Sequence, residues 1–301
     1  METVTNKKTL QDLMDSIPSI SEYFYNMNRA GDGRYNLDKF IPPVFTNWRD
    51  EQQSWGDSVG LLHQSHHMSE IYVKGPDALK FLEYYGVNSM KNFRLDKPKQ
   101  YVACSPSGHV IGDGILHRHA EDEFELIASS AIVNWLKYHA ETGDYDVEVR
   151  PDYSSHIDPS GKRKNWRFQL VGPNADPLLE ELIEEPALPD LKFFHKTTVT
   201  IRGCTALVLK HSMTTQGYEL SGPFEDEETV RNAILEVGEK YGITPVGTKT
   251  YFSNAAGSGW MARPVPAIYT DESLKPYREW LSSDSEEATL EIGGSYFSKI
   301  L

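Results

Sequence analysis

The densest run of chemically active side chains lies at residues 63–67, which read His-Gln-Ser-His-His. Imidazoles bind metal ions and transfer protons near neutral pH, and an amide hydrogen-bonds a polar ligand. If the run is helical, His63 and His67 share one face and supply half of a metal site. The sequence around them lacks the paired acidic and cysteine ligands that usually complete such a site, so it predicts no metal.

Three further stretches place polar groups among apolar ones. Asp113 stands between two glycines in the apolar strand that residues 110–117 predict. A glycine inside a strand lets a ligand approach closely, although an aspartate beside glycine is as readily a simple turn residue. Glu219 lies in a second apolar strand, where a glutamate usually faces solvent. Tyr251 and Trp260 lie in an aromatic, glycine-rich stretch that is either a ligand-binding loop or a connector.

An internal repeat indicates how such side chains are gathered. Residues 71–83 read IYVKGPDALKFLE, and residues 168–180, 97 positions later, read FQLVGPNADPLLE. Both copies predict a strand, a Gly-Pro turn and a helix, with Asp77 or Asn174 as the N-cap of that helix.

Similar elements follow each copy. Strands over 100–105, 110–117 and 123–128 and a helix over 131–141 follow the first, and strands over 198–202, 205–211 and 218–221 and a helix over 226–241 follow the second. Short connections favour antiparallel pairing, because parallel neighbours need a crossover of a dozen or more residues. The sequence therefore predicts an α+β fold of two pseudo-symmetric β-α-β-β-β-α-β halves with mainly antiparallel sheets.

The repeat divides the chain into three segments. We expect a helical N-terminal extension at residues 1–45, a first half at 46–160, and a second half with a C-terminal extension at 161–301. The boundary falls in the polar stretch 151–164, which is rich in Asp, Ser, Gly and Lys. A crevice between two related halves is a favoured place for a small ligand. A duplicated scaffold without any site is the alternative.

Composition narrows the class of partner. The 301 residues carry a net charge of −14, which repels nucleic acid and anionic membranes where no basic patch overrides it. The densest basic run, residues 162–164, lies in a loop-like segment. The sequence has no signal-peptide pattern and no apolar stretch long enough to span a membrane. Two cysteines 100 positions apart make neither a disulfide framework nor a structural zinc site. We therefore expect a cytoplasmic protein that binds neither nucleic acid nor membranes.

Several stretches, in one order along the chain, carry a family resemblance. They are QSHHM at 64–68, GPDAL at 75–79, VIGDGI at 110–115, NWLKYHAETG at 134–143, FF at 193–194, GYELSGP at 217–223 and KPYREWL at 275–281. From residue 42 onward the chain resembles the tetrahydrofolate-dependent aryl O-demethylases that act on vanillate and syringate. More distantly, it resembles the glycine-cleavage T-protein, an aminomethyltransferase with a duplicated fold.

The resemblance implies methyl transfer from a small methoxylated aromatic compound to N5 of tetrahydrofolate, giving a phenol and 5-methyltetrahydrofolate. By its match to the family pattern, Tyr251 is the catalytic tyrosine and Glu219 the pterin-binding glutamate. Asp113 matches a folate-side aspartate of the T-protein, although Gly112 replaces the neighbouring acid of that protein. Trp260 joins Asp113 and Glu219 among the residues expected to bind the cofactor.

The substrate side of the implied site follows in the same way. Gln64 and His67 match polar residues that line the aromatic substrate pocket. As the ether breaks, the leaving oxygen must be neutralised, and a tyrosine hydroxyl with a pKa near 10 is a suitable donor. On the other side, a carboxylate accepts two parallel N–H bonds from the amino-amide edge of a pterin. Holding both reactants in position is expected to supply much of the rate.

Two departures from the family pattern leave other readings open. Ser129 stands where the vanillate-type enzymes have an arginine, so a benzoate carboxylate loses its salt-bridge donor. The family also continues into a C-terminal β-barrel that helps to cover the folate and is missing here. The alternatives are a folate-binding protein without demethylase activity, or a subunit completed by a separate barrel chain or by a homo-oligomer.

Overall fold

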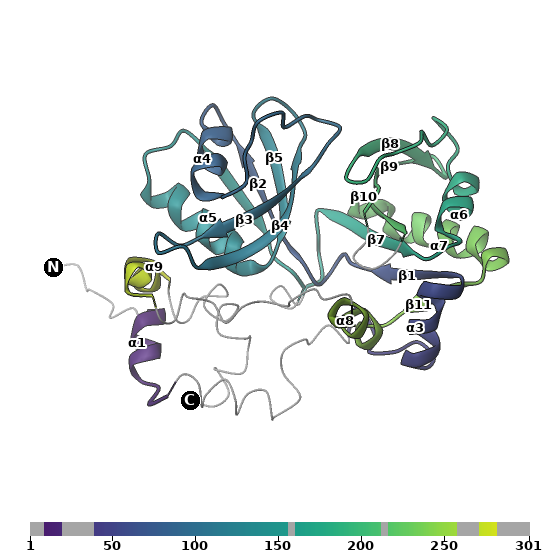
Figure 1. Cartoon of the computed structure of the whole chain (residues 1–301), viewed down its shortest axis with the longest axis horizontal. Coiled ribbons are helices and arrows are strands. Elements are labelled where there is room, and N and C mark those ends of the chain that lie inside the picture. The colour runs from purple at the N-terminus through teal and green to yellow at the C-terminus, as the bar shows by residue number, and fades with distance from the viewer. Residues whose placement is uncertain (1–8, 20–38, 156–159, 212–215, 258–270, 282–301) are drawn as a thin grey trace.

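The computed structural model describes residues 9–19, 39–155, 160–211, 216–257 and 271–281. Trp260 lies outside them. Figure 1 shows the sheets of the two halves side by side, with α1 (Leu10–Asp15) and α9 (Lys275–Trp280) below the first half. The backbone N–H of Leu10 donates to the carbonyl of Leu281 across 2.7 Å, so the N-terminal extension packs against the last described segment.

The first half forms one antiparallel sheet with two helices. Its elements are β2 (Ser69–Lys74), α4 (Ala78–Tyr85), β3 (Lys99–Cys104), β4 (Val110–Arg118), β5 (Glu123–Ala128), α5 (Ser130–Thr142) and β6 (Glu148–Asp152). The five strands lie in the order β3-β4-β5-β2-β6, and each neighbouring pair is antiparallel. This is the β-α-β-β-β-α-β pattern that the sequence predicts.

The second half repeats that pattern and adds one strand. Its elements are β7 (Asn165–Val171), α6 (Ala175–Leu182), β8 (Lys196–Ile201), β9 (Cys204–Leu209), β10 (Gly217–Pro223), α7 (Glu227–Gly238) and β11 (Ile243–Val246). Between β7 and β11 lies β1 (Val59–His63), which gives the order β11-β1-β7-β10-β9-β8. Strand β1 pairs antiparallel with β7 and parallel with β11. The prediction of an α+β fold with mainly antiparallel sheets is confirmed.

Strand β1 is the main difference between the two sheets. It comes from the N-terminal side of the first repeat yet belongs to the sheet of the second, so the chain crosses between the halves directly after it (Figure 1). Helix α3 (Trp48–Asp57) covers β1 closely, because a Cβ on Gly60 would lie 2.8 Å from the ring of Trp55. The division at residue 160 stays a prediction. Residues 59–63 precede it in the sequence but pair with strands that follow it.

The two Gly-Pro turns have the same backbone conformation. Gly75 has φ +139° and Gly172 has φ +134°, values that favour glycine. A Cβ would lie 2.5 Å from the carbonyl oxygen of Asp146 in the first case and 2.4 Å from that of Ser58 in the second. Each glycine therefore allows another segment to pass against the turn.

The sequence predicts that the Asx residues after these turns cap their helices, but their side chains do not. Asp77 and Asn174 occupy the N-cap positions, but neither side chain makes a capping hydrogen bond, since both have ψ near zero instead of the extended value that capping requires. The Asp77 carboxylate accepts the backbone N–H of Asp146 at 3.1 Å, and the Asn174 amide donates to the carbonyl of Tyr241 at 2.8 Å. Each residue joins the start of its half to the connection before its last strand.

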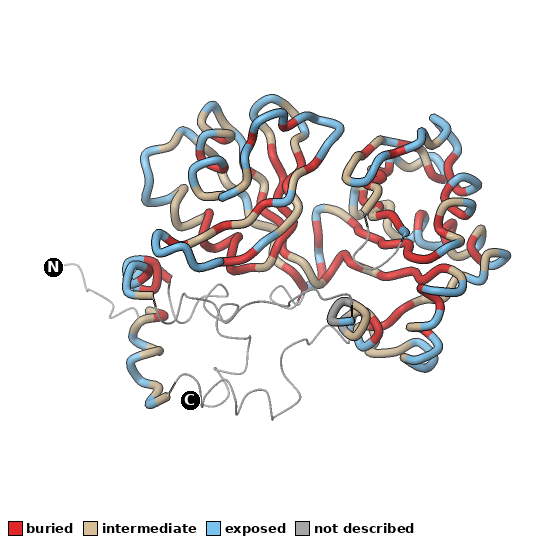
Figure 2. Tube along the Cα trace, viewed as in Figure 1, coloured by how far each residue is buried: buried red, intermediate tan, exposed pale blue. Residues whose placement is uncertain are grey.

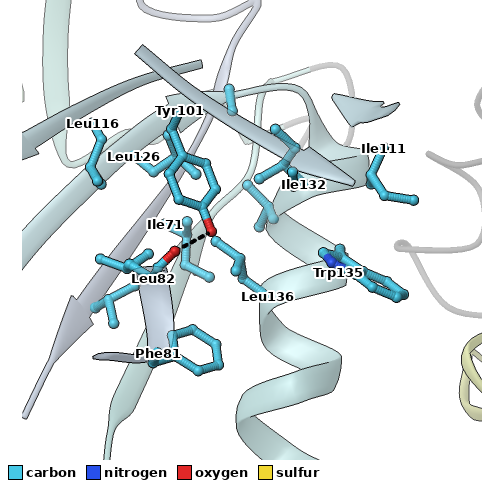
Figure 3. Close-up of a cluster of buried hydrophobic side chains, with 14 of the residues drawn as sticks. Ile71, Phe81, Leu82, Tyr101, Ile111, Leu116, Leu126, Ile132, Trp135 and Leu136 are labelled. Atoms are coloured by element: carbon cyan, nitrogen blue, oxygen red, sulfur yellow. Dashed lines mark hydrogen bonds between the residues drawn. The ribbon is translucent and has the colours of Figure 1, made fainter. Parts of the chain in front are cut away.

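Each half has its own apolar core, which appears as buried stretches of both sheets and of the helices on them in Figure 2. Figure 3 shows the first core, in which Tyr101 and Leu116 from the sheet face Leu82 of α4 and Leu136 of α5. The Tyr101 hydroxyl donates to the backbone carbonyl of Leu82 at 3.1 Å, which satisfies the polar end of a fully buried ring.

A buried ion cluster joins the two halves. Arg167 of β7 donates through Nε to Glu70 of β2 at 2.7 Å and through Nη2 to Glu125 of β5 at 2.5 Å. These three side chains are less than 10% exposed. An arginine of the second half therefore forms ion pairs with two carboxylates of the first. Among the described helices, none is long and apolar enough to cross a membrane.

Candidate active site

A small recess, with about 10 Å³ of free space, opens where β1 ends, beside β11 and α8 (Thr248–Gly257). Gln64, His67 and Tyr251, which the sequence assigned to the substrate side, all line it. Apolar walls come from Ile41, Leu62 and Val246. The structure therefore brings together the three residues expected to handle the methyl donor.

Glu51 fixes the start of α8 and thereby Tyr251. Its carboxylate is fully buried and accepts four hydrogen bonds. They come from the backbone N–H groups of Phe45 (2.6 Å), Thr46 (2.8 Å) and Gly247 (2.9 Å) and from the hydroxyl of Thr250 (3.2 Å). Burial alone raises the pKa of Glu51, but these donors outweigh it and leave the pKa below its usual value.

Tyr251 and His67 form a directed pair. The Tyr251 hydroxyl lies 3.2 Å from Nε2 of His67, and the two rings meet edge to face with centroids 5.0 Å apart. Nδ1 of His67 lies 3.2 Å from the backbone carbonyl of Gln64. A carbonyl only accepts, so Nδ1 carries the hydrogen of a neutral imidazole and Nε2 accepts the hydrogen of Tyr251. Burial lowers the pKa of His67 to about 4, which keeps the ring neutral at physiological pH.

The side-chain amides of Gln64 and Gln169 connect the recess to Glu219, on the expected folate side. Gln64 donates through Nε2 to Oε1 of Gln169 at 3.4 Å, and Gln169 donates through Nε2 to Oε1 of Glu219 at 3.4 Å. Strand register explains the arrangement, because Gln169 of β7 stands directly across from Leu62 of β1 and from Glu219 of β10. Gln169 is fully buried. Glu219 is thus linked to the Tyr251 pocket through one side chain.

Glu219 has a second partner, His211, which follows β9. Nδ1 of His211 lies 2.8 Å from Oε1 of Glu219, and each side chain is less than 20% exposed. Burial acts to raise the pKa of Glu219, but the charge and hydrogen bond of His211 outweigh it and lower that pKa. Burial also acts to lower the pKa of His211, and Glu219 outweighs it in the opposite direction. The pair therefore favours an ionised carboxylate.

Asp113 belongs to the sheet of the first half. It is exposed on β4 of the first sheet and accepts a hydrogen bond from the Gln100 amide at 2.9 Å. No contact given for the described residues joins it to Glu219 or Tyr251. Ser129, at the expected arginine position, is the N-cap residue of α5, and its hydroxyl lies 3.1 Å from where a Cβ of Gly112 would stand.

The histidines of residues 63–67 are arranged differently from those of a helix. Residues 65–67 form a turn, so His63 approaches His66, with ring centroids 4.9 Å apart, instead of His67. His63, His66 and Glu227 have possible metal-ligand atoms within 4.8 Å of one another. Each has a protein partner already: Nε2 of His63 contacts Glu227 at 3.1 Å, and His66 contacts Ser155 at 2.6 Å. The hydrogen bonds account for the cluster without an ion.

Gln169 and His211 are the residues of this array that sequence reasoning passed over. Gln169 interrupts the apolar strand FQLV, and such an isolated polar residue is the signal that could have found it. His211 follows an apolar strand and offers no comparable pattern. Its pairing with Glu219 depends on the register of β9 and β10, in which Glu219 stands across from Leu209.

Comparison with known proteins agrees with the fold. The GCVT N-terminal domain family matches residues 22–260. Syringate O-demethylase from a Sphingobium species is 38% identical over 295 residues, covering 98% of this chain and 63% of the relative. An aminomethyltransferase from Clostridium botulinum is 31% identical over 213 residues, covering 69% of this chain and 54% of the relative.

A solved structure shares the fold. The crystal structure of glycine cleavage system aminomethyltransferase T from Bartonella henselae superposes with a TM-score of 0.61 at 19% identity, covering 80% of this chain and 63% of that one. The chain spans less than two thirds of the length of each of these three proteins. The match over residues 22–260 shows that the chain belongs to the GCVT N-terminal domain family.

Proposed function

We propose that the protein is a cytoplasmic methyltransferase that moves a methyl group from a methoxylated aromatic compound to N5 of tetrahydrofolate. One observation carries the proposal. The pair Tyr251 and His67 lies in an apolar recess, where Nδ1 of His67 contacts the backbone carbonyl of Gln64. From there the side chains of Gln64 and Gln169 lead to the mostly buried carboxylate of Glu219. A donor-side group and an acceptor-side group thus belong to one continuous polar array. The 38% identity to a syringate O-demethylase supports the choice of an aryl ether as donor.

Glu219 fits the role of pterin anchor. Among the described residues, both hydrogen bonds given for its side chain end on Oε1, and none ends on Oε2. The carboxylate is ionised, because its pKa is lowered, and its side chain is 17% exposed. An ionised carboxylate with an available oxygen binds an N–H donor strongly. Tetrahydrofolate supplies a nucleophilic nitrogen, N5, that receives the methyl group.

The reaction breaks the bond between the methyl carbon and the phenolic oxygen, forms a bond between that carbon and N5, and leaves the N5 proton to reach the phenol oxygen. Tyr251 stabilises the developing negative charge on that oxygen by donating its hydroxyl hydrogen. A hydroxyl has only one hydrogen, so it turns from Nε2 of His67 to the leaving oxygen. His67, held neutral by burial, orients the hydroxyl beforehand without adding a positive charge.

The chemistry of the residues that line the recess suits a flat, largely apolar ring, and in this proposal their side chains move apart to admit it. Leu62 and Val246 flank it, and the Gln64 amide gives a polar contact for a ring substituent. Among the described lining residues there is neither lysine nor arginine. In this proposal a partner that bears a barrel domain helps to cover the folate.

The proposal is tested with purified protein, tetrahydrofolate and, in separate reactions, syringate, vanillate and guaiacol under anaerobic conditions. Chromatography with mass detection measures the phenol and 5-methyltetrahydrofolate. We expect both products in equal amounts from at least one donor. Folate binding without either product would favour a folate-binding protein that lacks demethylase activity. Restoration of turnover by an added barrel-domain chain would identify the protein as one part of a two-chain enzyme.

A further inference from the structure

The second partner of Glu219 limits how the proposed folate site binds its ligand. His211 donates from Nδ1 to Oε1 at 2.8 Å, and Gln169 donates to the same oxygen at 3.4 Å. A carboxylate oxygen has two lone pairs, so Oε1 already has its usual number of donors. Oε2 receives none from the described residues.

A pterin needs both oxygens. Its amino-amide edge presents two parallel N–H donors, and these bind a carboxylate with one hydrogen bond on each oxygen. One of them can use Oε2 directly. The other needs a lone pair on Oε1, which His211 and Gln169 share in the structure described here. Binding of two donors therefore requires one of these residues to leave.

His211 is the partner better able to move. Gln169 is fully buried within β7, whereas the His211 side chain is 16% exposed and follows the end of β9. Aromatic rings bound it: the centroid of Phe194 lies 5.1 Å away, edge to face, and that of Phe193 lies 5.9 Å away. Phe193 is 66% exposed. An imidazole that leaves Oε1 thus moves beside a solvent-accessible aromatic surface.

We propose that His211 is a positioning residue that holds Glu219 in the free protein and gives up Oε1 to the second N–H of a pterin, so that ligand binding releases a proton from His211. The inference rests on the proposed function, because it assumes that Glu219 binds a pterin. It adds that the site distinguishes a ligand with two parallel N–H donors, which displaces His211, from a ligand with one donor, which binds Oε2 and leaves His211 in place.

The sign of the pH effect follows from the groups around the pair. Glu219 faces His211 directly from β10, and Arg167 of β7 and His67 act on Glu219. From the turn before β8, Phe193 and Phe194 pack against the His211 ring. In the free protein Glu219 raises the pKa of His211 above its usual value. Once displaced, His211 loses that stabilisation and binds its proton less tightly. The affinity for the pterin therefore increases with pH until His211 is neutral in the free protein, by at most about tenfold per pH unit for one linked proton.

Isothermal titration calorimetry of the full chain with tetrahydrofolate, without an aryl ether, tests the inference. Titrations from pH 5.5 to 8.5, in buffers of different ionisation enthalpy, give the dissociation constant and the number of protons released. We expect proton release and an affinity that rises several-fold over this range. In His211→Gln, which keeps an N–H donor but does not titrate, proton release and the pH dependence should disappear. His195→Gln, in the same turn region, serves as the matched control and should behave as the wild type.

The outcomes separate the inference from the function on which it rests. Tetrahydrofolate binding with no proton release, or a pH dependence retained in His211→Gln, would overturn the role of His211 and leave the methyltransferase proposal standing. No tetrahydrofolate binding at any pH, in protein whose circular dichroism and melting temperature show a folded state, would overturn both. A Glu219→Gln variant that binds as tightly as the wild type would likewise remove the basis of the inference.

Discussion

The hydroxyl of Tyr251 points its hydrogen at a nitrogen of His67 that can only accept it. The two atoms lie 3.2 Å apart, and the other ring nitrogen of His67 is held by the carbonyl of Gln64 at 3.2 Å. The backbone thus fixes the tautomer of the histidine, and the tautomer fixes the direction of the tyrosine hydroxyl. The hydrogen is presented in the recess where the proposed methyl donor binds.

Replacing Tyr251 by phenylalanine should remove most methyl transfer while tetrahydrofolate affinity stays within about twofold. The hydroxyl acts mainly as the ether breaks, and loss of such a donor typically lowers kcat by about 10²- to 10⁴-fold. Steady-state kinetics and calorimetric titration measure the two effects separately. Tyr84→Phe, at a tyrosine that is 73% exposed, is the matched control and should be unaffected. Equal loss of binding and turnover would mean that Tyr251 is a packing residue.

Glu51→Gln should impair the protein by releasing the start of α8. The new amide nitrogen cannot accept a hydrogen bond. Donors such as the Gly247 N–H and the Thr250 hydroxyl therefore lose their acceptor. Leaving buried donors unsatisfied costs about 1–3 kcal/mol. We expect a lower urea midpoint and lower turnover, with little change in folate affinity. Glu83→Gln, on the exposed face of α4, should change none of these quantities. Unchanged turnover in Glu51→Gln would show that Tyr251 is positioned by other contacts.

Arg167→Met should strongly destabilise the association of the two halves. It removes the cation that Glu70 and Glu125 share, while Arg163 stays 3.5 Å from Glu70 and His119 stays 2.7 Å from Glu125. A fully uncompensated buried charge costs about 3–5 kcal/mol, so we expect a loss of up to that size. Urea unfolding followed by tryptophan fluorescence measures the loss. Arg202→Met, which removes an exposed ion pair with Glu236, should cost less than about 1 kcal/mol. Similar losses in the two variants would mean that the buried cluster contributes little to stability.

Gly172→Ala and Gly75→Ala should destabilise the protein to a similar degree. Both glycines have positive φ, and in both a Cβ would lie 2.5 Å or less from a carbonyl oxygen of another segment. The cost should exceed about 1 kcal/mol in each case. Gly56→Ala is the control, because this helical glycine has nothing within 4 Å of the added carbon, and it should be neutral or slightly stabilising. Melting temperatures compare the three variants. A large difference between the two turns would contradict their equivalence.

Stability should decrease as pH falls from about 6.5 to 4. Burial lowers the pKa of His66, His67 and His139 to about 4 in the folded chain. The unfolded chain therefore binds more protons in this window, and unfolding becomes easier as acid is added. Urea midpoints over a pH series measure the slope. His139→Gln should make it shallower, while His109→Gln, at an exposed side chain, should not. An unchanged slope in His139→Gln would contradict the assigned protonation.

Local sequence patterns predicted the repeated architecture well. Alternating apolar residues and the Gly-Pro turns identified the strands and helices of both halves, because these signals depend on neighbours along the chain. Strand β1 was missed since its short apolar run has no strand partner nearby in sequence; its partners are β7 and β11. The sequence left open whether residues 63–67 are helical; they form the end of β1 and a turn, which brings His63 next to His66.

The site was only partly accessible from the sequence. The family pattern named Gln64, His67 and Tyr251, which line one recess. The expectation that Asp113 binds the same cofactor as Glu219 stays a prediction, because β4 and β10 belong to different sheets and no contact among the described residues joins the two carboxylates. The pairing of His211 with Glu219 follows from the register between β9 and β10, a long-range property that residue types do not reveal.

The most direct test of the central claim follows the methyl group itself. Syringate labelled with carbon-13 in its methoxy groups is incubated with the protein and tetrahydrofolate, and the reaction is observed by carbon-13 NMR. We expect the methoxy signal to decrease as an N5-methyl signal of 5-methyltetrahydrofolate grows in equal amount. A methoxy signal that stays constant, or label that appears as methanol or formaldehyde instead, would contradict it.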